Sequence, residues 1–282
     1  MIGEELNWYT SINALTKKLG MTRQNFYKGR SARVRAEVDA AFVEQLVRSE
    51  RALQPRLGGR KLLKILVPVF KSKGIKLGRD RFFDILREKG LLVPPLPKSP
   101  VTTRFEPSLP VFHNLVSGLA LTGTNQAWAA DITYIRTDEG FLYLSLITDM
   151  WSRKIVGFHV GDSLETEGAL FALSMALASL RYGAKPVHHS DRGCQYASHL
   201  YVGKLKEAGL QISMTEEFHC YENAMAERMN GILKQEYYIG SCFKNKNQAK
   251  TAVKQAVYLY NTRRPHKSLD YETPENMHRT AA

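Results

Sequence analysis

The sequence predicts an α/β fold for the C-terminal part of the chain, preceded by an all-α region. Between residues 128 and 160, three short apolar runs joined by turns are typical of an antiparallel meander. Helical and strand-like periods then alternate to about residue 239, whereas the first 90 residues show helical spacing alone. The 282 residues leave room for one domain of about 150 residues and one or two smaller ones.

The positive charge of the chain is concentrated in its N-terminal part. The formal net charge is +13. Residues 1–112 carry 22 Lys and Arg against 10 Asp and Glu, whereas residues 113–282 carry 18 against 17. This distribution favours a polyanionic partner for the first part of the chain, although a solvated face that keeps the protein in solution would also explain it.

The cysteine content and hydropathy of the sequence indicate in which cellular compartment the protein is expected. The three cysteines, Cys194, Cys220 and Cys242, are widely spaced and offer neither a disulfide framework nor a CxxC zinc pair. No secretory signal and no run of eighteen apolar residues occurs. We therefore expect a cytoplasmic protein with reduced thiols and no membrane partner.

The first 92 residues are predicted to form helices. Ile12, Leu15 and Leu19 precede a turn at Gly20, and a basic helix then begins near Arg23; this pair is either a small helix-turn-helix or a packing hairpin. Residues 34–53 form an amphipathic helix whose apolar stripe, Val34, Val38, Phe42 and Leu46, should face a core. Helices over about 60–73 and 79–89 follow, and the last carries Arg79 and Arg81.

Prolines mark a domain boundary. Six of the eleven prolines fall between residues 94 and 110, which removes amide donors and favours an extended chain. The predicted organisation is a helical region with helix-turn-helix units over 1–92, a linker over 93–112 and an α/β domain over 113–282.

Five strands and three helices are predicted after the linker. The strands cover 128–136, 141–148, 154–160, 186–190 and 210–215, and the helices cover 164–180, 198–208 and 222–239. The order is βββαβαβα.

Three carboxylates stand out in this pattern. Asp191 ends a strand and is followed by a glycine turn, and Asp131 lies within the first strand. Glu227 follows Asp191 after thirty-five residues and shares one helix face with Asn223, Asn230 and Lys234. A fourth carboxylate, Asp149 at the end of the second strand, is interpreted as turn chemistry, paired with Arg153.

These segments resemble the acidic triad of insertion-sequence transposases whose catalytic domain is similar to that of retroviral integrases. The order is Asp131, Asp191, thirty-five residues, Glu227. Residues 260–269, with the run Arg263-Arg264-Pro265-His266, resemble the segment that closes this domain. The resemblance spans about residues 10 to 275. It implies a ribonuclease-H-like mixed five-stranded sheet in which the fourth strand lies beside the first and brings the two aspartates together.

The resemblance also implies a chemistry. The chain is expected to be a DNA transposase that cuts at the ends of its element and transfers the strands into target DNA. Three converging carboxylates repel one another, and Mg²⁺, with Mn²⁺ as the alternative, would relieve this repulsion, with two ions per active site. Lys234 and Arg228 would approach DNA phosphates, and His189 and Asn223 would support the carboxylates.

Partners follow from the same resemblance. Residues 79–89 resemble a recognition helix, so Arg79, Arg81 and Arg23 are expected to bind the double-stranded DNA of element ends or target. The resemblance also implies a homo-oligomer on DNA and association with the bacterial nucleoid. It further implies an upstream open-reading-frame product, either separate or fused by frameshifting.

The alternative function is that of a catalytically silent regulator of transposition. A nuclease for RNA-DNA hybrids would share the sheet but not explain the N-terminal helices.

Overall fold

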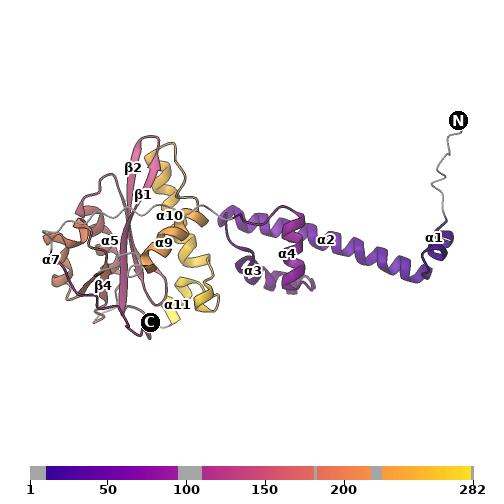
Figure 1. Cartoon of the computed structure of the whole chain (residues 1–282), viewed down its shortest axis with the longest axis horizontal. Helices are drawn as coiled ribbons and strands as arrows, with labels where there is room; N and C mark the ends of the chain where they lie inside the picture. Colours follow the sequence, from indigo (N-terminus) through magenta and orange to yellow (C-terminus); the bar gives the residue numbers. More distant parts are fainter. Residues whose placement is uncertain (1–10, 95–109, 181–182, 217–223, 281–282) are drawn as a thin grey trace. The chain divides into compact units, whose positions relative to one another are not determined.

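The computed structural model describes residues 11–94, 110–180, 183–216 and 224–280 (Figure 1). The chain forms two compact units, one from residues 1–49 and 66–92 and the other from residues 50–65 and 93–282. Residues 50–65 therefore group with the C-terminal unit, although they precede the proline-rich stretch. Most of that stretch, residues 95–109, lies outside the described residues, and the domain boundaries at 92 and 112 stay predictions.

Four helices occupy the N-terminal part of the chain: α1 Ile12–Lys18, α2 Arg23–Leu53, α3 Gly59–Ser72 and α4 Arg79–Glu88. The Thr22 hydroxyl accepts a hydrogen bond from the Asn25 amide at 3.2 Å, which begins α2 where a cap was predicted. The separate helix predicted over 34–53 was wrong in extent, because it is the second part of α2.

The apolar stripe predicted along α2 is only partly buried. Phe42 and Leu46 are partly buried, but the side chains of Val34 and Val38 are 51% and 64% exposed, and the fully buried residues of this helix are instead Val43 and Val47. The prediction that Val34 and Val38 face a core was therefore wrong. The core of this unit lies instead around the second part of α2, where the rings of Phe70 and Phe82 pack 6.2 Å apart.

The C-terminal unit contains the predicted five-stranded mixed sheet. Its strands are β1 Ala127–Thr137, β2 Gly140–Asp149, β3 Ile155–Gly161, β4 Val187–Ser190 and β5 Gln211–Met214, in the order β3-β2-β1-β4-β5. The first three strands pair antiparallel, and β1 pairs with β4 and β4 with β5 in parallel. The predicted adjacency of the fourth strand and the first is confirmed.

Helices cover both faces of this sheet (Figure 1). The helices α5 Thr166–Ala178, α6 Cys194–Ala197 and α7 His199–Glu207 form one apolar core with it, built around Trp128, Leu173 and Tyr201. The helices α9 Ala224–Glu236 and α10 Lys246–Arg263 form the other, and η1 Lys267–Leu269 and α11 Pro274–Thr280 follow. No described helix is both long and apolar enough to cross a membrane.

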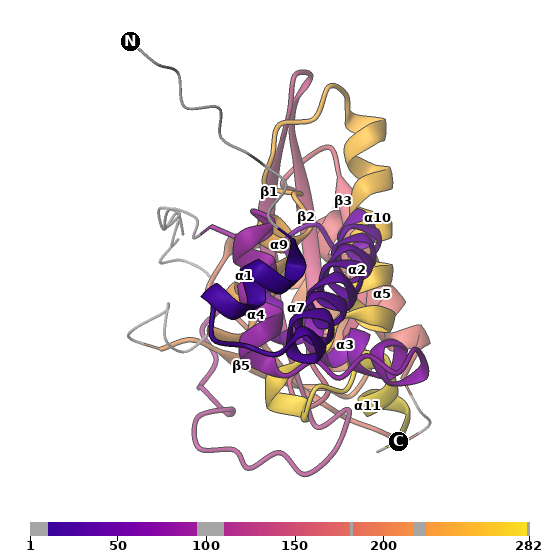
Figure 2. The ribbon, with the colours of Figure 1, turned by 90° about the vertical axis from the view of Figure 1, so that its right-hand side faces the viewer.

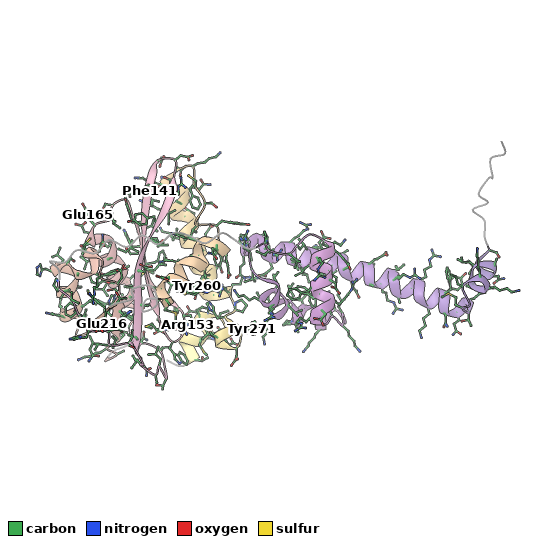
Figure 3. The ribbon with its side chains drawn as sticks, in the orientation of Figure 1. Phe141, Arg153, Glu165, Glu216, Tyr260 and Tyr271 are labelled. Carbon is green, nitrogen blue, oxygen red and sulfur yellow. The ribbon has the colours of Figure 1, made fainter. Side chains whose placement is uncertain are left out.

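Two contacts fix α10 against the sheet. At the tip of the β1-β2 hairpin, the Asp138 amide donates to the Phe243 carbonyl at 2.9 Å, so the hairpin lies beside the segment that leads into α10 (Figure 2). Farther along α10, the Tyr260 hydroxyl donates to the Arg153 carbonyl at 2.7 Å (Figure 3). These contacts hold the helix that precedes the Arg263-Arg264 pair.

Gly157 marks the tightest approach between the sheet and α5, and its replacement by alanine should be destabilising. A methyl group there would overlap the carbonyl oxygen of Ala172 and lie 3.0 Å from the Cβ of Ala176. We expect a loss of about 1–3 kcal/mol in the free energy of unfolding, measured by urea denaturation. Gly203→Ala is the control, because a methyl group at this exposed helical position meets nothing within 4 Å. It should stabilise by up to roughly 1 kcal/mol, and equal effects of the two changes would contradict the prediction.

Candidate active site

Sheet register places Asp131 and Asp191 side by side. In the parallel pair of β1 and β4, Ala129 lies opposite His189. Two residues farther along each strand are Asp131 and Asp191, and neighbouring strands lie about 4.8 Å apart. The structure therefore brings together the first two carboxylates of the predicted triad.

The environment of Asp131 disfavours its charged form. Burial first, then the negative charge of Asp191 and, to a smaller extent, that of Glu227 raise the pKa of Asp131, which is about 7. Two hydrogen bonds oppose this rise: Asn230 Nδ2 donates to Asp131 Oδ2 at 2.7 Å, and the Ile132 amide donates to Oδ1 at 2.9 Å. The carboxyl group is thus held in a fixed orientation by two hydrogen bonds.

A tight turn holds Asp191. The Gly193 amide donates to Asp191 Oδ1 at 3.0 Å. A Cβ atom on residue 193 would lie 2.9 Å from that same oxygen, which is closer than real contacts allow. The glycine after the second carboxylate is therefore needed because the carboxylate folds back over it.

The third carboxylate lies at the start of α9. Glu227 is exposed in the first turn, and partial burial raises its pKa. One turn later, Asn230 contacts Asp131. Lys234 lies one further turn along the helix; burial lowers its pKa, and the negative charge of Asp131 acts in the opposite direction. The predicted apolar face of this helix is confirmed, because Met229 and Leu233 are buried against the sheet.

The oxygen atoms at this site suit a hard divalent cation, but the three carboxylates do not form a closed cluster. Among the described residues, no three His, Cys, Asp or Glu side chains stand close enough to hold one metal ion. Asp131 and Asp191 are adjacent, and Glu227 lies within electrostatic range of Asp131. In addition, Asn230 Oδ1 is buried without a hydrogen-bond partner. Among the described residues, a buried amide oxygen without a hydrogen-bond partner beside two neighbouring carboxylates fits a site that binds a cation.

Tyr196 is a site residue to which sequence reasoning gave no role. It lies on α6, five residues after Asp191, and its hydroxyl is buried without a hydrogen-bond partner. Its pKa is raised by burial and then by the charges of Tyr201, Asp131 and Asp191, so the hydroxyl lies near both carboxylates. The feature of the sequence that could have identified Tyr196 as a site residue is its position shortly after the second aspartate.

The residues predicted to support the carboxylates have different positions. His189 is buried on β4, and its Nδ1 lies 2.9 Å from the Ser213 hydroxyl. Asn223 lies outside the described residues. Arg228 is exposed on α9. A supporting role for His189 and Asn223, and a DNA contact by Arg228, stay predictions.

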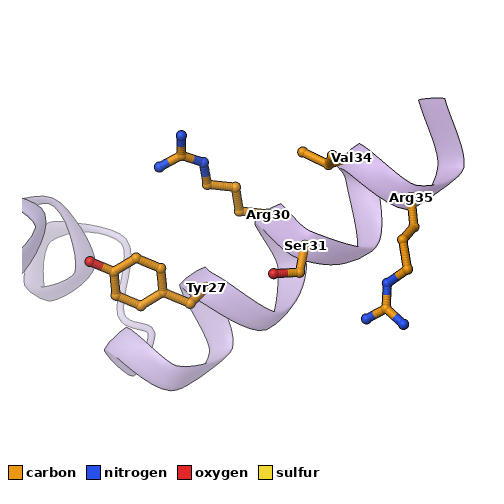
Figure 4. Close-up of a pocket in the computed structure, with 5 residues that line it drawn as sticks. All are labelled: Tyr27, Arg30, Ser31, Val34 and Arg35. Carbon is orange, nitrogen blue, oxygen red and sulfur yellow. The ribbon is translucent and has the colours of Figure 1, made fainter. Parts of the chain in front are cut away.

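The predicted DNA-binding arginines of the N-terminal unit are exposed. On α4, Arg79 pairs with Asp80 at 2.8 Å and Arg81 with Glu88 at 3.0 Å. Arg23 begins α2. A shallow hollow on the same helix is lined by Tyr27, Arg30, Ser31, Val34 and Arg35 (Figure 4). DNA contacts by these arginines stay a prediction.

Asp149 has the turn role that was predicted for it. Its Oδ1 accepts from the Ser152 amide and hydroxyl, both at 2.7 Å, and its Oδ2 accepts from the Asn125 amide at 2.7 Å. The neighbouring guanidinium of Arg153 donates instead to the Met150 carbonyl. The fourth carboxylate is therefore occupied by backbone and hydroxyl donors.

Comparisons with known proteins agree with this geometry. Two family models described as integrase core domain match residues 122–220 and 208–274. A Shigella sonnei protein, the insertion element IS600 uncharacterized 31 kDa protein, is 37% identical over 217 residues, which are 75% of this chain and 80% of the relative. Transposase InsF for insertion sequence IS3A of Escherichia coli (strain K12) is 34% identical over 235 residues, covering 83% and 81% of the two chains.

A solved structure is similar at lower identity. The HTLV-2 integrase catalytic core domain in complex with magnesium covers 55% of this chain and 96% of its own, with 18% identity and a TM-score of 0.44. The identities over more than two thirds of both full-length relatives decide the assignment. This chain belongs to the family of insertion-sequence transposases that carry an integrase core domain.

Proposed function

We propose that this transposase cuts DNA at the ends of its insertion sequence and joins the freed ends to target DNA at one metal-dependent site. The site consists of Asp131, Asp191 and Glu227. The observation that supports it best is the proximity of two aspartates, Asp131 in β1 and Asp191 directly after the neighbouring strand β4, the first with its pKa raised to about 7. The half-buried Lys234 lies within electrostatic range of Asp131, so a cationic side chain is also present at this site.

Divalent metal binding is part of this proposal. Asp131 and Asp191 would hold Mg²⁺ or Mn²⁺, Glu227 would join them, and Asn230 would fix the orientation of Asp131. We propose two ions per site. When bound, the ions supply positive charge that favours the attacking and leaving oxygens of an in-line phosphoryl displacement.

The side chains around the carboxylates would position the DNA. Lys234 lies on the face of α9 that carries Glu227 and Asn230, so its ammonium group is placed to bind a phosphate next to the scissile bond. Burial lowers the pKa of Lys234, and a bound phosphate would reverse this effect. The Tyr196 hydroxyl, which lacks a partner, would donate to one of the aspartates once they are both ionised.

The partners follow from the family. We propose that the substrate is double-stranded DNA, both element ends and target, that the protein acts as a homo-oligomer on that DNA, and that the basic N-terminal unit holds the ends. An upstream open-reading-frame product, separate or fused, would add further DNA contacts. The reaction would take place in the bacterial cytoplasm, on nucleoid DNA.

Metal-dependent cleavage of labelled element-end DNA tests this function. With Mg²⁺ or Mn²⁺, the purified protein should release nicked and joined products, and Asp191→Asn should reduce them by at least about 10³-fold, because the metal site is lost. Binding of the end DNA should be unchanged in that variant. The control is Glu167→Gln, which removes an exposed carboxylate in the first turn of α5.

Two outcomes would reject the proposal. Equal products from Asp191→Asn and the unsubstituted protein would remove this site from the chemistry. Salt-dependent binding of end DNA without products at any metal concentration would favour the silent regulator instead.

A further inference from the structure

Two consecutive arginines at the end of α10 bind two carboxylates that are far apart in the sequence. Arg263 donates to both oxygens of Glu50, at 2.8 and 2.7 Å. Arg264 donates to both oxygens of Glu236, also at 2.8 and 2.7 Å. Each pair has the two-pronged geometry that makes arginine-carboxylate contacts strong and directional.

The segment 50–61 makes further contacts with the end of α9. Lys61 Nζ lies 3.0 Å from Glu236 Oε1, and the Arg56 amide donates to the Glu236 carbonyl at 3.2 Å. The Tyr237 hydroxyl donates to Gln54 Oε1 at 3.1 Å. The carboxylate of Glu236 therefore pairs with two cationic side chains, Arg264 and Lys61, and its backbone carbonyl accepts one amide hydrogen bond, from Arg56. Lys61 and Arg56 both lie in the segment 50–61, about 180 positions before Glu236 in the sequence.

The charges of Arg264, Glu236 and Glu50 are largely buried, so water cannot replace these contacts at little cost. Arg264 has only 2% of its side chain exposed, and its Nη1 lies 2.8 Å from His266 Nε2. Burial and the charge of Arg264 lower the pKa of His266 to about 2, so this histidine is neutral and accepts the hydrogen bond. A network of buried ions contributes little net stability compared with an apolar core, but it permits one arrangement of its elements.

The network holds the helix that carries Glu227. Glu236 ends α9 and Glu227 lies nine positions earlier, about 13 Å along the helix axis. Between them, Met229 Sδ accepts a hydrogen bond from the Tyr260 hydroxyl at 3.3 Å, and the Arg264 guanidinium lies over the Tyr260 ring at 5.8 Å. Arg264 thus contacts the end of α9 and Tyr260 its middle, while Arg263 holds Glu50, whose neighbour Gln54 bonds to both Glu50 and Tyr237. The side chain of Glu227 in the first turn of α9 is exposed.

We propose that Arg263 and Arg264, by binding Glu50 and Glu236, are positioning residues that hold α9, and with it Glu227, in register with Asp131 and Asp191. This proposal rests on the proposed role of Glu227. It assigns residues 50–61 to the catalytic unit as a part that the active site needs. It also gives the Arg263-Arg264 run a function that a terminal tail would not have.

Arg263→Gln in the full-length protein is the first test, because Arg263 is 46% exposed and its loss should leave the fold intact. We expect amide hydrogen exchange of residues 226–236 to become about tenfold faster. The rate of end cleavage should fall about tenfold, whereas the affinity for end DNA should not change. The matched control is Arg48→Gln, which breaks an exposed arginine-glutamate pair on α2 with a similar distance of 2.8 Å.

A charge exchange separates positioning from simple stability. Glu50→Arg combined with Arg263→Glu restores an ion pair with reversed polarity and should recover most of the cleavage rate and of the α9 protection. Unchanged exchange of α9 in Arg263→Gln would overturn the proposal, and so would a loss of cleavage that the charge exchange does not repair. If Arg263→Gln does not fold, Arg263→Lys keeps the charge but not the second hydrogen bond, and the same changes in exchange and rate decide the question.

Hydrogen exchange makes this test independent of the chemistry. If the unsubstituted protein never cleaves DNA, the proposed function fails, but protection of α9 still reports whether the arginine pair holds it. If cleavage occurs and α9 is insensitive to Arg263, only the positioning role fails.

Discussion

Asp131→Asn is expected to abolish strand cleavage, by at least about 10³-fold, and yet to make the metal-free protein more stable at pH 8. The loss of cleavage follows from the loss of a metal ligand. The gain in stability follows from the raised pKa of Asp131, which shows that the folded protein holds an ionised carboxylate here at a cost. Asparagine has no charge, and its amide nitrogen can donate to the unpaired Asn230 Oδ1.

The pH window of this effect is set by two pKa values. Below the unfolded value of 3.8, Asp131 is protonated in both states and contributes nothing. Between 3.8 and the folded value of about 7, the unfolded chain loses its proton first, so the free energy of unfolding falls as the pH rises. Above pH 7 the full penalty is present, on the order of a few kcal/mol at about 1.4 kcal/mol per pKa unit. The asparagine variant should lack this slope.

Thermal melting with and without Mg²⁺ measures both effects. At pH 8 without metal, Asp131→Asn should melt roughly 5–10 °C above the unsubstituted protein, and at pH 4 the two should be close. Millimolar Mg²⁺ should raise the melting temperature of the unsubstituted protein and leave that of the variant unchanged. Glu167→Gln is the control for loss of one charge. A variant that melts lower than the unsubstituted protein at pH 8 would contradict the raised pKa.

The elements of the catalytic unit were predictable because their patterns are local. Alternating apolar residues defined β1 and β2 to within a residue or two at each end. The spacing of Met229 and Leu233 gave the buried face of α9, and that of Glu227 and Lys234 the face adjacent to it. The pairing of β4 with β1 was not encoded in any local pattern and came from the family resemblance alone.

Two helices were misjudged for different reasons. The stripe on α2 contains Val34 and Val38, which have core-like spacing but nothing to cover them, since burial depends on elements that spacing does not reveal. The helix α10 was not assigned, although Ala249, Val253 and Tyr260 repeat at helical intervals and are buried. This spacing is a local pattern from which α10 could have been predicted.

The arginine network could not be predicted from the sequence. The run Arg263-Arg264 was noted as a motif, but its partner Glu50 lies 213 positions earlier. Ion pairs between distant segments depend on the tertiary fold, and any of the acidic residues could have been chosen. The unpaired Tyr196 hydroxyl is similar, because its burial depends on the packing of α6 and α7.

Arg264→Met is expected to lower the free energy of unfolding of the C-terminal unit by about 3–5 kcal/mol. The substitution leaves Glu236 buried with Lys61 as its one remaining cationic side chain. It also removes the donor to His266 and the cation over the Tyr260 ring. Arg48→Met at the exposed pair with Glu44 should cost less than about 1 kcal/mol, because water replaces that contact.

The double variant Arg264→Met, Glu236→Met decides whether the large loss comes from the missing contact or from the carboxylate left behind. If the uncompensated charge dominates, removing Glu236 as well should recover most of the 3–5 kcal/mol, since two apolar side chains can fill the same space. Lys61 would not replace it as a buried charge, because burial, the largest cause of its lowered pKa, persists when Glu236 no longer opposes it, and Lys61 can lose its proton. Urea denaturation of the two variants measures the difference. A double variant as unstable as the single one would show that the ion pair itself, through its geometry, supplies the stability, and that α9 depends on Arg264 for its folding as well as for its position.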